Sequence, residues 1–332
     1  MSLVVSKTPY RISFFGGGTD YPDWYREEGG QVLSTTIDKY CYITCRLLPE
    51  FFPPQHRIIW ASIEHVANVA DIRHPAVREA LLMMGYDDSR GIEIIHQGEL
   101  PARSGMGSSS AFAAGLIYGL SLLKGEDLGQ SNIYRHAIEL EQQRLAEHVG
   151  SQDQVAVSVG GMNHIRFGPG DQIEIDPLEI DEQRKTALND RLMLFFLGRK
   201  RFASDIAGEV IANLRARRSD LSQIHEHVEL STSVLKNGSD LDDFGRLLDE
   251  TWQLKRTLSH SVSNDTVDQV YATATRHGAI GGKLLGAGGT GFMLFYVPHE
   301  RQAQVRQALD EFIHLPFHFE DGGCRLVSNS EG

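Results

Sequence analysis

The segment Pro101–Ala111 holds the residues of this chain best suited to chemistry, because two glycines and three serines lie within it. A short β-like run, 91–95, precedes it, and residues 112–123 follow with helical apolar spacing. Glycine lets a backbone approach a ligand closely, and a helix N-terminus offers unpaired N–H groups and positive dipole potential to an anion. The order of strand, Gly/Ser loop and helix therefore predicts a phosphate-binding loop, and we expect the chain to handle a nucleotide.

Two further glycine loops, 16–20 and 286–291, need separate interpretation. The second spells GxGxxG, the dinucleotide-binding fingerprint, but it leads into an apolar β run, 292–297, where that fingerprint requires a helix. The Gly/Ser loop of residues 101–111, called the serine loop below, lacks the lysine of a Walker loop. Any one of the three loops could be a tight turn alone, but three of them with hydroxyls and charges nearby favour a binding site.

Four charged residues near these loops could supply the chemistry. Arg11 and Asp20 lie on either side of the glycines of the loop 16–20, where they could also form a plain surface ion pair. Asp153 precedes an apolar run, 155–159, which we expect to be a strand, so it could equally be a turn residue. Glu141 falls on the apolar stripe of a predicted helix, 131–147, and a carboxylate there needs a partner, either a metal or an arginine.

Length and composition limit the classes of protein to which this chain can belong. At 332 residues the chain predicts two domains, and its net charge of -12 with no basic run excludes nucleic acid as the main partner. Three scattered cysteines, no signal peptide and no apolar run long enough to cross a bilayer predict a cytoplasmic protein that does not bind membranes.

Both helices and strands are expected along the chain, which predicts an α+β protein. We expect strands at 3–5, 11–15, 31–37, 40–47, 57–61 and 162–167, and helices at 75–84 and 131–147, the latter capped by Ser131. The charged stretch 181–190 resembles a linker. We place the domain boundary there, with a nucleotide-binding and catalytic domain at 1–185 and a substrate-closing domain at 186–332.

Three motifs together resemble those of the GHMP kinases, a family that includes galactokinase, homoserine kinase and mevalonate kinase. They are Pro9–Tyr21, Pro101–Ala111 and Lys283–Phe292, in that order and across almost the whole chain. The resemblance implies an N-terminal S5-like α/β domain and a C-terminal ferredoxin-like sandwich. It also implies an enzyme that uses ATP and Mg²⁺ to phosphorylate a small molecule.

Within the family, four segments look like the D-glycero-D-manno-heptose 7-phosphate kinase branch: Phe15–Asp20, Ile72–Pro75, Gly150–Gln154 and Gly198–Ser204. This resemblance implies ATP-dependent phosphorylation of that sugar phosphate at its anomeric hydroxyl, giving the 1,7-bisphosphate. A fucose-like or galactose-like acceptor is an alternative, although galactokinases have Glu-His where this chain has Gly17-Gly18. A sensor that binds sugar and ATP without turnover is another, and the presence of both Asp153 and Arg11 speaks against it.

The resemblance also implies a role for each matched residue. Asp153 would be the general base, and Arg11 would lie beside it, keep it ionised and offset charge on the phosphoryl group. ATP would be held by the loop residues Pro101, Gly105, Met106, Gly107, Ser108, Ser109 and Ser110. Mg²⁺ would be held by Ser108 or Ser109 together with Glu141, with Glu147 as the alternative.

The sugar phosphate would be bound by Gly17, Gly18, Thr19, Asp20, Gly288, Gly289 and Arg201. Arg199, Lys200 and Arg201 either bind the existing phosphate of that substrate or form a solvated cationic turn. The expected partners are therefore a sugar phosphate and ATP, and the sequence leaves a homodimer open.

Overall fold

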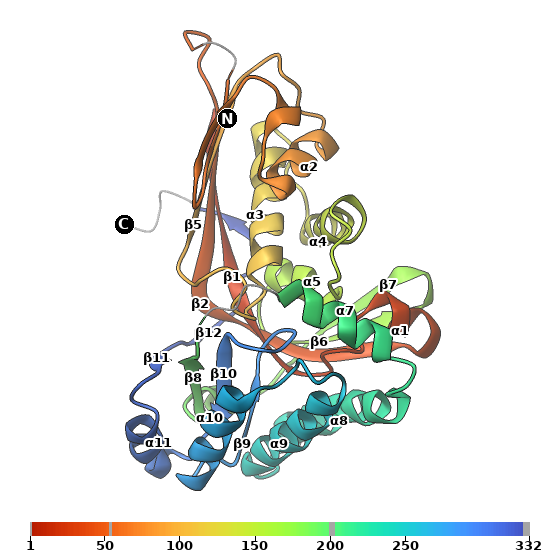
Figure 1. Cartoon of the computed structure of the whole chain (residues 1–332), viewed down its shortest axis with the longest axis vertical. Coiled ribbons are helices and arrows are strands. Elements are labelled where there is room, and N and C mark those ends of the chain that lie inside the picture. The colour runs from red at the N-terminus through yellow and green to blue at the C-terminus, as the bar shows by residue number, and fades with distance from the viewer. Residues whose placement is uncertain (1, 53–54, 199–202, 328–332) are drawn as a thin grey trace.

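The computed structural model describes residues 2–52, 55–198 and 203–327. Two sheets organise these residues (Figure 1). The larger, nine-stranded sheet runs in the order β13-β1-β2-β5-β3-β4. In addition, β12 and β6 pair with β2, and β7 pairs with β6. The smaller sheet has four antiparallel strands in the order β11-β8-β10-β9.

The larger sheet is built on two long antiparallel strands, β1 (Leu3–Phe15) and β2 (Gly30–Leu47). The sequence predicts two shorter strands in place of each, and this prediction is wrong. Polar residues continue β1 through the expected gap because their hydroxyls find partners inside the fold: Ser6 Oγ donates to the Gly115 carbonyl at 2.7 Å, and Thr8 Oγ1 to Cys324 Sγ at 3.2 Å. The pairing shifts register after Pro9 and after Ser13, close to the loop 16–20.

Helix α3 (Ser108–Leu123) packs on β1 and β2 and carries the serine loop at its N-terminus (Figure 1). Two glycines let it approach the sheet closely: a Cβ on Gly115 would lie 2.9 Å from Thr8 Oγ1, and one on Gly119 would lie 2.9 Å from Cys45 Sγ. The helix is buried over almost its whole length. Its first turn is therefore held in a fixed position relative to β1.

Two helical segments beside α3 differ from the prediction. Helix α4 (Gln130–Ile138) follows Gly129 without a side-chain cap and continues as a π-helical segment, Glu139–Arg144, so neither the Ser131 cap nor the end at 147 is correct. The expected strand at 155–159 belongs to α5 (Gln152–Val159). Val155, Ala156 and Val157 are almost completely buried, and such a short run does not distinguish a strand from a buried helix.

The smaller sheet consists of β8 (Leu192–Phe196), β9 (Gly281–Leu284), β10 (Phe292–Tyr296) and β11 (Ile313–Leu315). Five helices accompany it: α7 (Ala203–Asn213), α8 (Arg218–Lys236), α9 (Asp242–Thr257), α10 (Asp265–Arg276) and α11 (Gln302–Ala308). The predicted linker is instead a helix, α6 (Glu182–Asn189), because the Asp181 side chain caps it by accepting from the N–H groups of Gln183 and Arg184.

The end of the described chain returns to the larger sheet, where β12 (Phe319–Glu320) pairs with β2 and β13 (Arg325–Leu326) with β1. The domain division at 185/186 stays a prediction.

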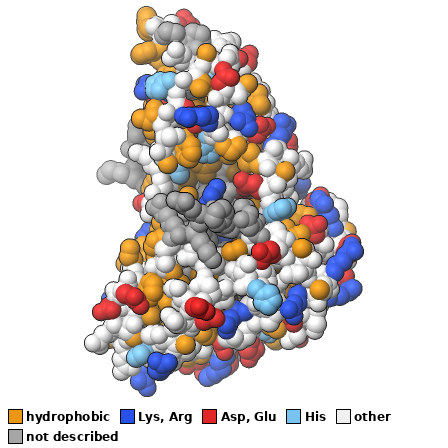
Figure 2. Space-filling model, viewed as in Figure 1, with side chains coloured by type: hydrophobic (Ala, Val, Ile, Leu, Met, Phe, Trp, Pro, Cys, Tyr) orange, Lys and Arg blue, Asp and Glu red, His pale blue; other side chains and the backbone are white. Residues whose placement is uncertain are grey.

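The remaining elements are α1 (Pro22–Glu28), β3 (His56–Ile59), β4 (Ile63–Val66), α2 (Pro75–Met83), β5 (Ile92–Gly98), β6 (Asn163–Gly168) and β7 (Gln172–Pro177). None of the helices in the described part of the chain is long and apolar enough to cross a membrane. Acidic and basic side chains are interspersed on the face that Figure 2 shows.

Candidate active site

A cavity of about 840 Å³ lies where the serine loop, the loop 16–20 and the C-terminal helices meet. Segments far apart in the sequence contribute to its lining. Among the lining residues are Arg11, Gly17, Gly18, Asp20, Gly105, Gly107, Ser108, Ser109, Ser110, Glu147, Asp153, Lys255, Lys283 and Gly286. The structure thus brings most of the residues that the sequence singles out to one place.

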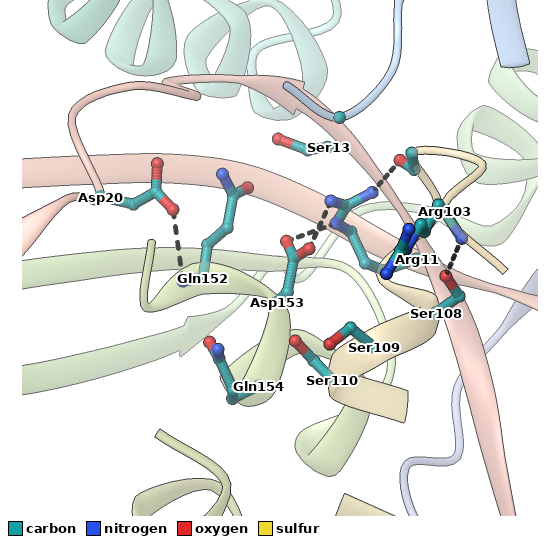
Figure 3. A network of polar contacts seen from close by, with 12 residues as sticks. Arg11, Ser13, Asp20, Arg103, Ser108, Ser109, Ser110, Gln152, Asp153 and Gln154 are labelled. Atoms are coloured by element: carbon teal, nitrogen blue, oxygen red, sulfur yellow. Dashed lines mark hydrogen bonds and ion pairs between the residues drawn. The ribbon is translucent and has the colours of Figure 1, made fainter. Parts of the chain in front are cut away.

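Arg11 and Asp153, which both line this cavity, form a bidentate ion pair (Figure 3). Arg11 Nε and Nη2 each donate to one carboxylate oxygen of Asp153 at 2.7 Å, and Nη1 donates to the Gly105 carbonyl at 2.6 Å. Only 3% of the Arg11 side chain is exposed, against 25% of Asp153. The guanidinium is therefore fixed from both sides, and the carboxylate stays partly open to the cavity.

The serine loop has the backbone conformation that anion binding requires. Gly105 and Gly107 both have a positive φ, of 82° and 71°, and Gly107 is the residue from which α3 begins. A Cβ on Gly107 would lie 3.0 Å from Arg11 Cγ and 3.6 Å from an Asp153 carboxylate oxygen. The first N–H groups of α3, which lack helical acceptors, are therefore presented next to the ion pair.

The loop 286–291 packs behind the serine loop. A Cβ on Gly286 would lie 2.5 Å from Gly105 Cα, and the Phe292 N–H donates to the Ser104 carbonyl at 3.1 Å. The two glycine turns are therefore in direct backbone contact, which only glycine permits at these positions. Gly288 and Gly289 contact Val262 and do not line the cavity.

Glu141 lies beneath the serine loop and is 1% exposed, as its place on the apolar stripe predicts. The Ser109 hydroxyl donates to one of its carboxylate oxygens, and Ser110 Oγ and Gln154 Nε2 donate to the other at 2.7 and 2.6 Å. Burial raises the pKa of Glu141 to about 7. All three donors are neutral, so the carboxylate has no cationic partner among the described residues.

Asp20 is also buried, and it lies on the side of Asp153 away from Ser108 (Figure 3). Its carboxylate accepts the backbone N–H of Gly18 at 3.0 Å and that of Gln152 at 3.4 Å. Burial raises the pKa of Asp20, and the charge of Asp153 adds to that effect. A carboxylate so close to the cavity can accept hydrogen bonds from the hydroxyls of a bound sugar.

Several predicted residues lie away from the cavity lining. Thr19 is fully buried, and its hydroxyl holds the turn by donating to the Gly16 and Gln31 carbonyls. Pro101 and Met106 do not line the cavity, although the Met106 carbonyl accepts the Arg11 N–H at 3.1 Å. Arg199, Lys200 and Arg201 lie outside the described residues.

Two lysines of the cavity are absent from the sequence-based site. Lys255 lies on α9 and Lys283 on β9, and both are almost completely buried. A signal for Lys255 exists, because it continues the buried stripe of α9 formed by Phe244, Leu248 and Trp252. Within the described ranges, no cluster of three or more His, Cys, Asp or Glu side chains is placed to hold a metal.

Sugar kinases are among the known proteins that this chain resembles. Over 321 residues the chain is 28% identical to D-glycero-alpha-D-manno-heptose 7-phosphate kinase of Campylobacter jejuni, covering 93% of this chain and 94% of that one. It is 30% identical to the bifunctional fucokinase/GDP-fucose pyrophosphorylase of Arabidopsis thaliana, where 91% of this chain corresponds to only 31% of the relative.

The fold is similar to the crystal structure of a D-glycero-D-manno-heptose 1-phosphate kinase from Bacteroides thetaiotaomicron, with a TM-score of 0.80 at 23% identity over 98% of this chain and 99% of that one. The family model of the GHMP kinases N terminal domain matches residues 67–161, which include the serine loop, Glu141 and Asp153. The model of the GHMP kinases C terminal domain matches residues 230–315, which include Lys255 and the loop 286–291. The expected two-domain α+β fold is confirmed, and the chain is a sugar kinase that belongs to the GHMP kinase family.

Proposed function

We propose that this protein transfers the γ-phosphoryl group of ATP to the anomeric hydroxyl of D-glycero-D-manno-heptose 7-phosphate, giving the 1,7-bisphosphate and ADP. The observation that carries the proposal is the ion pair of Arg11 and Asp153, which faces the cavity beside the start of α3. The name of the Campylobacter jejuni relative supports the choice of sugar, and that relative matches this chain over almost its full length.

In this proposal Asp153 acts as the general base. Its carboxylate takes the proton of the sugar hydroxyl as that oxygen attacks the γ-phosphorus, the new O–P bond forms, and ADP leaves with the electrons of the broken bond. Arg11 holds both carboxylate oxygens at 2.7 Å and so fixes their direction. Its positive charge also offsets the negative charge of the phosphoryl group in the transition state.

The serine loop binds the triphosphate. Backbone N–H groups at the start of α3 point to the ligand, and the dipole of the helix favours its negative charge. The loop 286–291 supports this arrangement from behind through the contact of Gly286 with Gly105. Catalysis by a phosphoryl-transfer enzyme consists mainly of such positioning and electrostatic stabilisation.

The residues around Glu141 fit a magnesium ion. The carboxylate is buried beside the serine loop with neutral donors only, and an exposed hydroxyl, that of Ser109, connects it to the cavity. Carboxylate and hydroxyl oxygens are ligands that Mg²⁺ accepts together with phosphate oxygens. Glu141 and Ser109 would hold the ion, with Ser108 next to them. When bound, Mg²⁺ neutralises charge on the phosphates of the nucleotide.

The sugar binds at the opposite end of the cavity, between the loop 16–20 and α7. Asp20 accepts hydrogen bonds from the sugar hydroxyls there. Gly18 has a φ of 110° and lies against Leu221 and Leu258, so at this position the loop presents backbone to the ligand. Binding of the sugar's existing phosphate by Arg199, Lys200 or Arg201 stays a prediction.

A panel of acceptors tests the proposal. The purified protein is supplied with ATP, Mg²⁺ and, in separate reactions, heptose 7-phosphate, heptose 1-phosphate, fucose or galactose, and ADP formation is followed with a coupled assay. We expect the highest kcat/KM for heptose 7-phosphate. Fucose is the second candidate because of the fucokinase relative, and a preference for it would reassign the acceptor. No ADP with any acceptor, together with ATP binding, would indicate a sensor.

A further inference from the structure

Lys255 occupies an unusual place for a lysine. It lies in the last turn of α9, on the face whose other members are Phe244, Leu248 and Trp252, and only 8% of it is exposed. Its Nζ donates to the Gly286 carbonyl at 2.5 Å and lies 3.4 Å from the Leu284 carbonyl. Among the described residues, no carboxylate lies within ion-pair distance of it. Its ammonium group is therefore buried with uncharged partners only.

The ammonium group of Lys255 is connected to the serine loop through Gly286. Gly286, whose carbonyl it holds, is the residue in backbone contact with Gly105. The Gly105 carbonyl in turn accepts a hydrogen bond from Arg11 Nη1 at 2.6 Å. Two cations, Arg11 and Lys255, are thus anchored to the two glycine turns that touch each other, and both line the same cavity.

A structural role alone does not account for the charge. Burying an ammonium group is unfavourable, and a neutral donor such as glutamine could hold the Gly286 carbonyl with a smaller desolvation penalty. The negative end of the α9 dipole favours a cation in the last helical turn, but this effect is small beside the cost of burying an ammonium group. A buried cation that faces a ligand cavity without a carboxylate partner suits an anionic ligand.

We infer that Lys255 is a further catalytic residue, whose ammonium group donates a hydrogen bond to the phosphoryl group in transfer, from the side of the loop 286–291. The inference depends on the proposed function, because it requires phosphoryl transfer in this cavity. Lys255 stays protonated through the step: the sugar oxygen forms the new bond to phosphorus, the bond from the γ-phosphorus to the bridging oxygen of ADP breaks, and Asp153 takes the proton. The ammonium group only stabilises charge on the oxygens of the transferred group.

The charges around Lys255 set the pH range over which it can act. Arg11 from β1 and Lys283 from β9 are the cations of the inner cavity, and Asp20 and Asp153 are its anions; Arg103, Glu147, His148 and Glu209 also line the cavity. Burial, with a further contribution from Arg11, lowers the pKa of Lys255 to about 8. Its charge is present below that pH and is lost as the pH rises through it.

Two variants and a control test the inference, with heptose 7-phosphate and ATP as substrates. K255M removes the charge and should lower kcat by about 10²-fold, the effect of losing one donor to a transition state, without raising KM for the sugar phosphate. K255R keeps the charge and should move the alkaline limb of kcat/KM from near pH 8 to above pH 10. K236M removes an exposed lysine from the last turn of α8 and should leave kcat unchanged.

The outcomes separate this inference from the proposed function. A wild-type protein without kinase activity on any acceptor would refute the function itself. An active wild type with an unchanged kcat in K255M would refute only the role of Lys255. A rise in KM for the sugar phosphate at unchanged kcat would also refute it, because it would assign Lys255 to the substrate's own phosphate. Should K255M fail to fold by circular dichroism, an alkaline limb that stays near pH 8 in K255R would overturn the inference.

Discussion

Replacement of Gly286 by alanine tests whether contact between the two glycine turns positions the site. Gly286 has a φ of 74°, and a new Cβ would lie 2.5 Å from Gly105 Cα, whereas an ordinary contact begins at 3.4 Å. The two backbones would therefore have to separate by about 0.9 Å. A misplacement of about 1 Å can slow a reaction by about 10²-fold, so we expect a loss of kcat of that order in G286A.

The matched control is Gly238→Ala. Gly238 has a φ of 71°, nearly the same as Gly286, but a Cβ there would have no atom within 4 Å. Both variants share the backbone strain of alanine at positive φ, about 1–3 kcal/mol, and each kcal/mol lowers Tm by roughly 2–4 °C in domains of 150–250 residues. G238A should lose a few degrees of Tm and no activity, whereas G286A should lose more of both.

Thermal unfolding and steady-state kinetics of the two variants give the answer. The kinetic assay is the coupled detection of ADP at saturating ATP and sugar phosphate. A kcat of G286A equal to that of G238A, with equal Tm, would contradict this prediction. It would mean that the contact between the glycine turns has no part in aligning the serine loop with Arg11 and Asp153.

Two further predictions concern the buried carboxylates. Because the pKa of Asp20 is raised in the folded protein, its contribution to stability is present at low pH and is lost as the pH rises from near 3.8 through the folded pKa. The Tm of D20N should therefore exceed the wild-type Tm by more at pH 8 than at pH 4. An equal difference in Tm at both pH values would contradict the burial of the Asp20 charge. E141Q should lower kcat and raise the Mg²⁺ concentration needed for half-maximal rate, whereas E147Q should change both less, and the reverse ranking in a Mg²⁺ titration would assign the metal to Glu147.

The sequence predicts the parts of this site that depend on local signals. The order of β-run, Gly/Ser loop and helix around 101–111 is what the structure has, because glycine and the start of a helix leave clear marks in a sequence. The burial of Glu141 follows correctly from helical periodicity. Its partners Ser109, Ser110 and Gln154 do not, since they come from two other helices.

The errors have physical causes as well. The run after Asp153 is mostly apolar because most of α5 is buried among other elements, so periodicity could not distinguish it from a strand. Lysine is mostly exposed in proteins, so its residue type gives no reason to place Lys255 or Lys283 in a buried site, although Lys283 begins the third motif. The return of β12 and β13 to the larger sheet depends on contacts across almost the whole chain, for which short strands give no local signal.

Replacing Asp153 by asparagine tests the central assignment most directly, with turnover and nucleotide affinity measured on the same preparation. The variant keeps the shape of the side chain but cannot take the proton of the acceptor alcohol. We expect the kcat of D153N to fall by about 10²–10⁴-fold while its Kd for ATP changes little. Turnover that survives at the wild-type level would contradict the assignment of the base, and with it the proposed course of phosphoryl transfer.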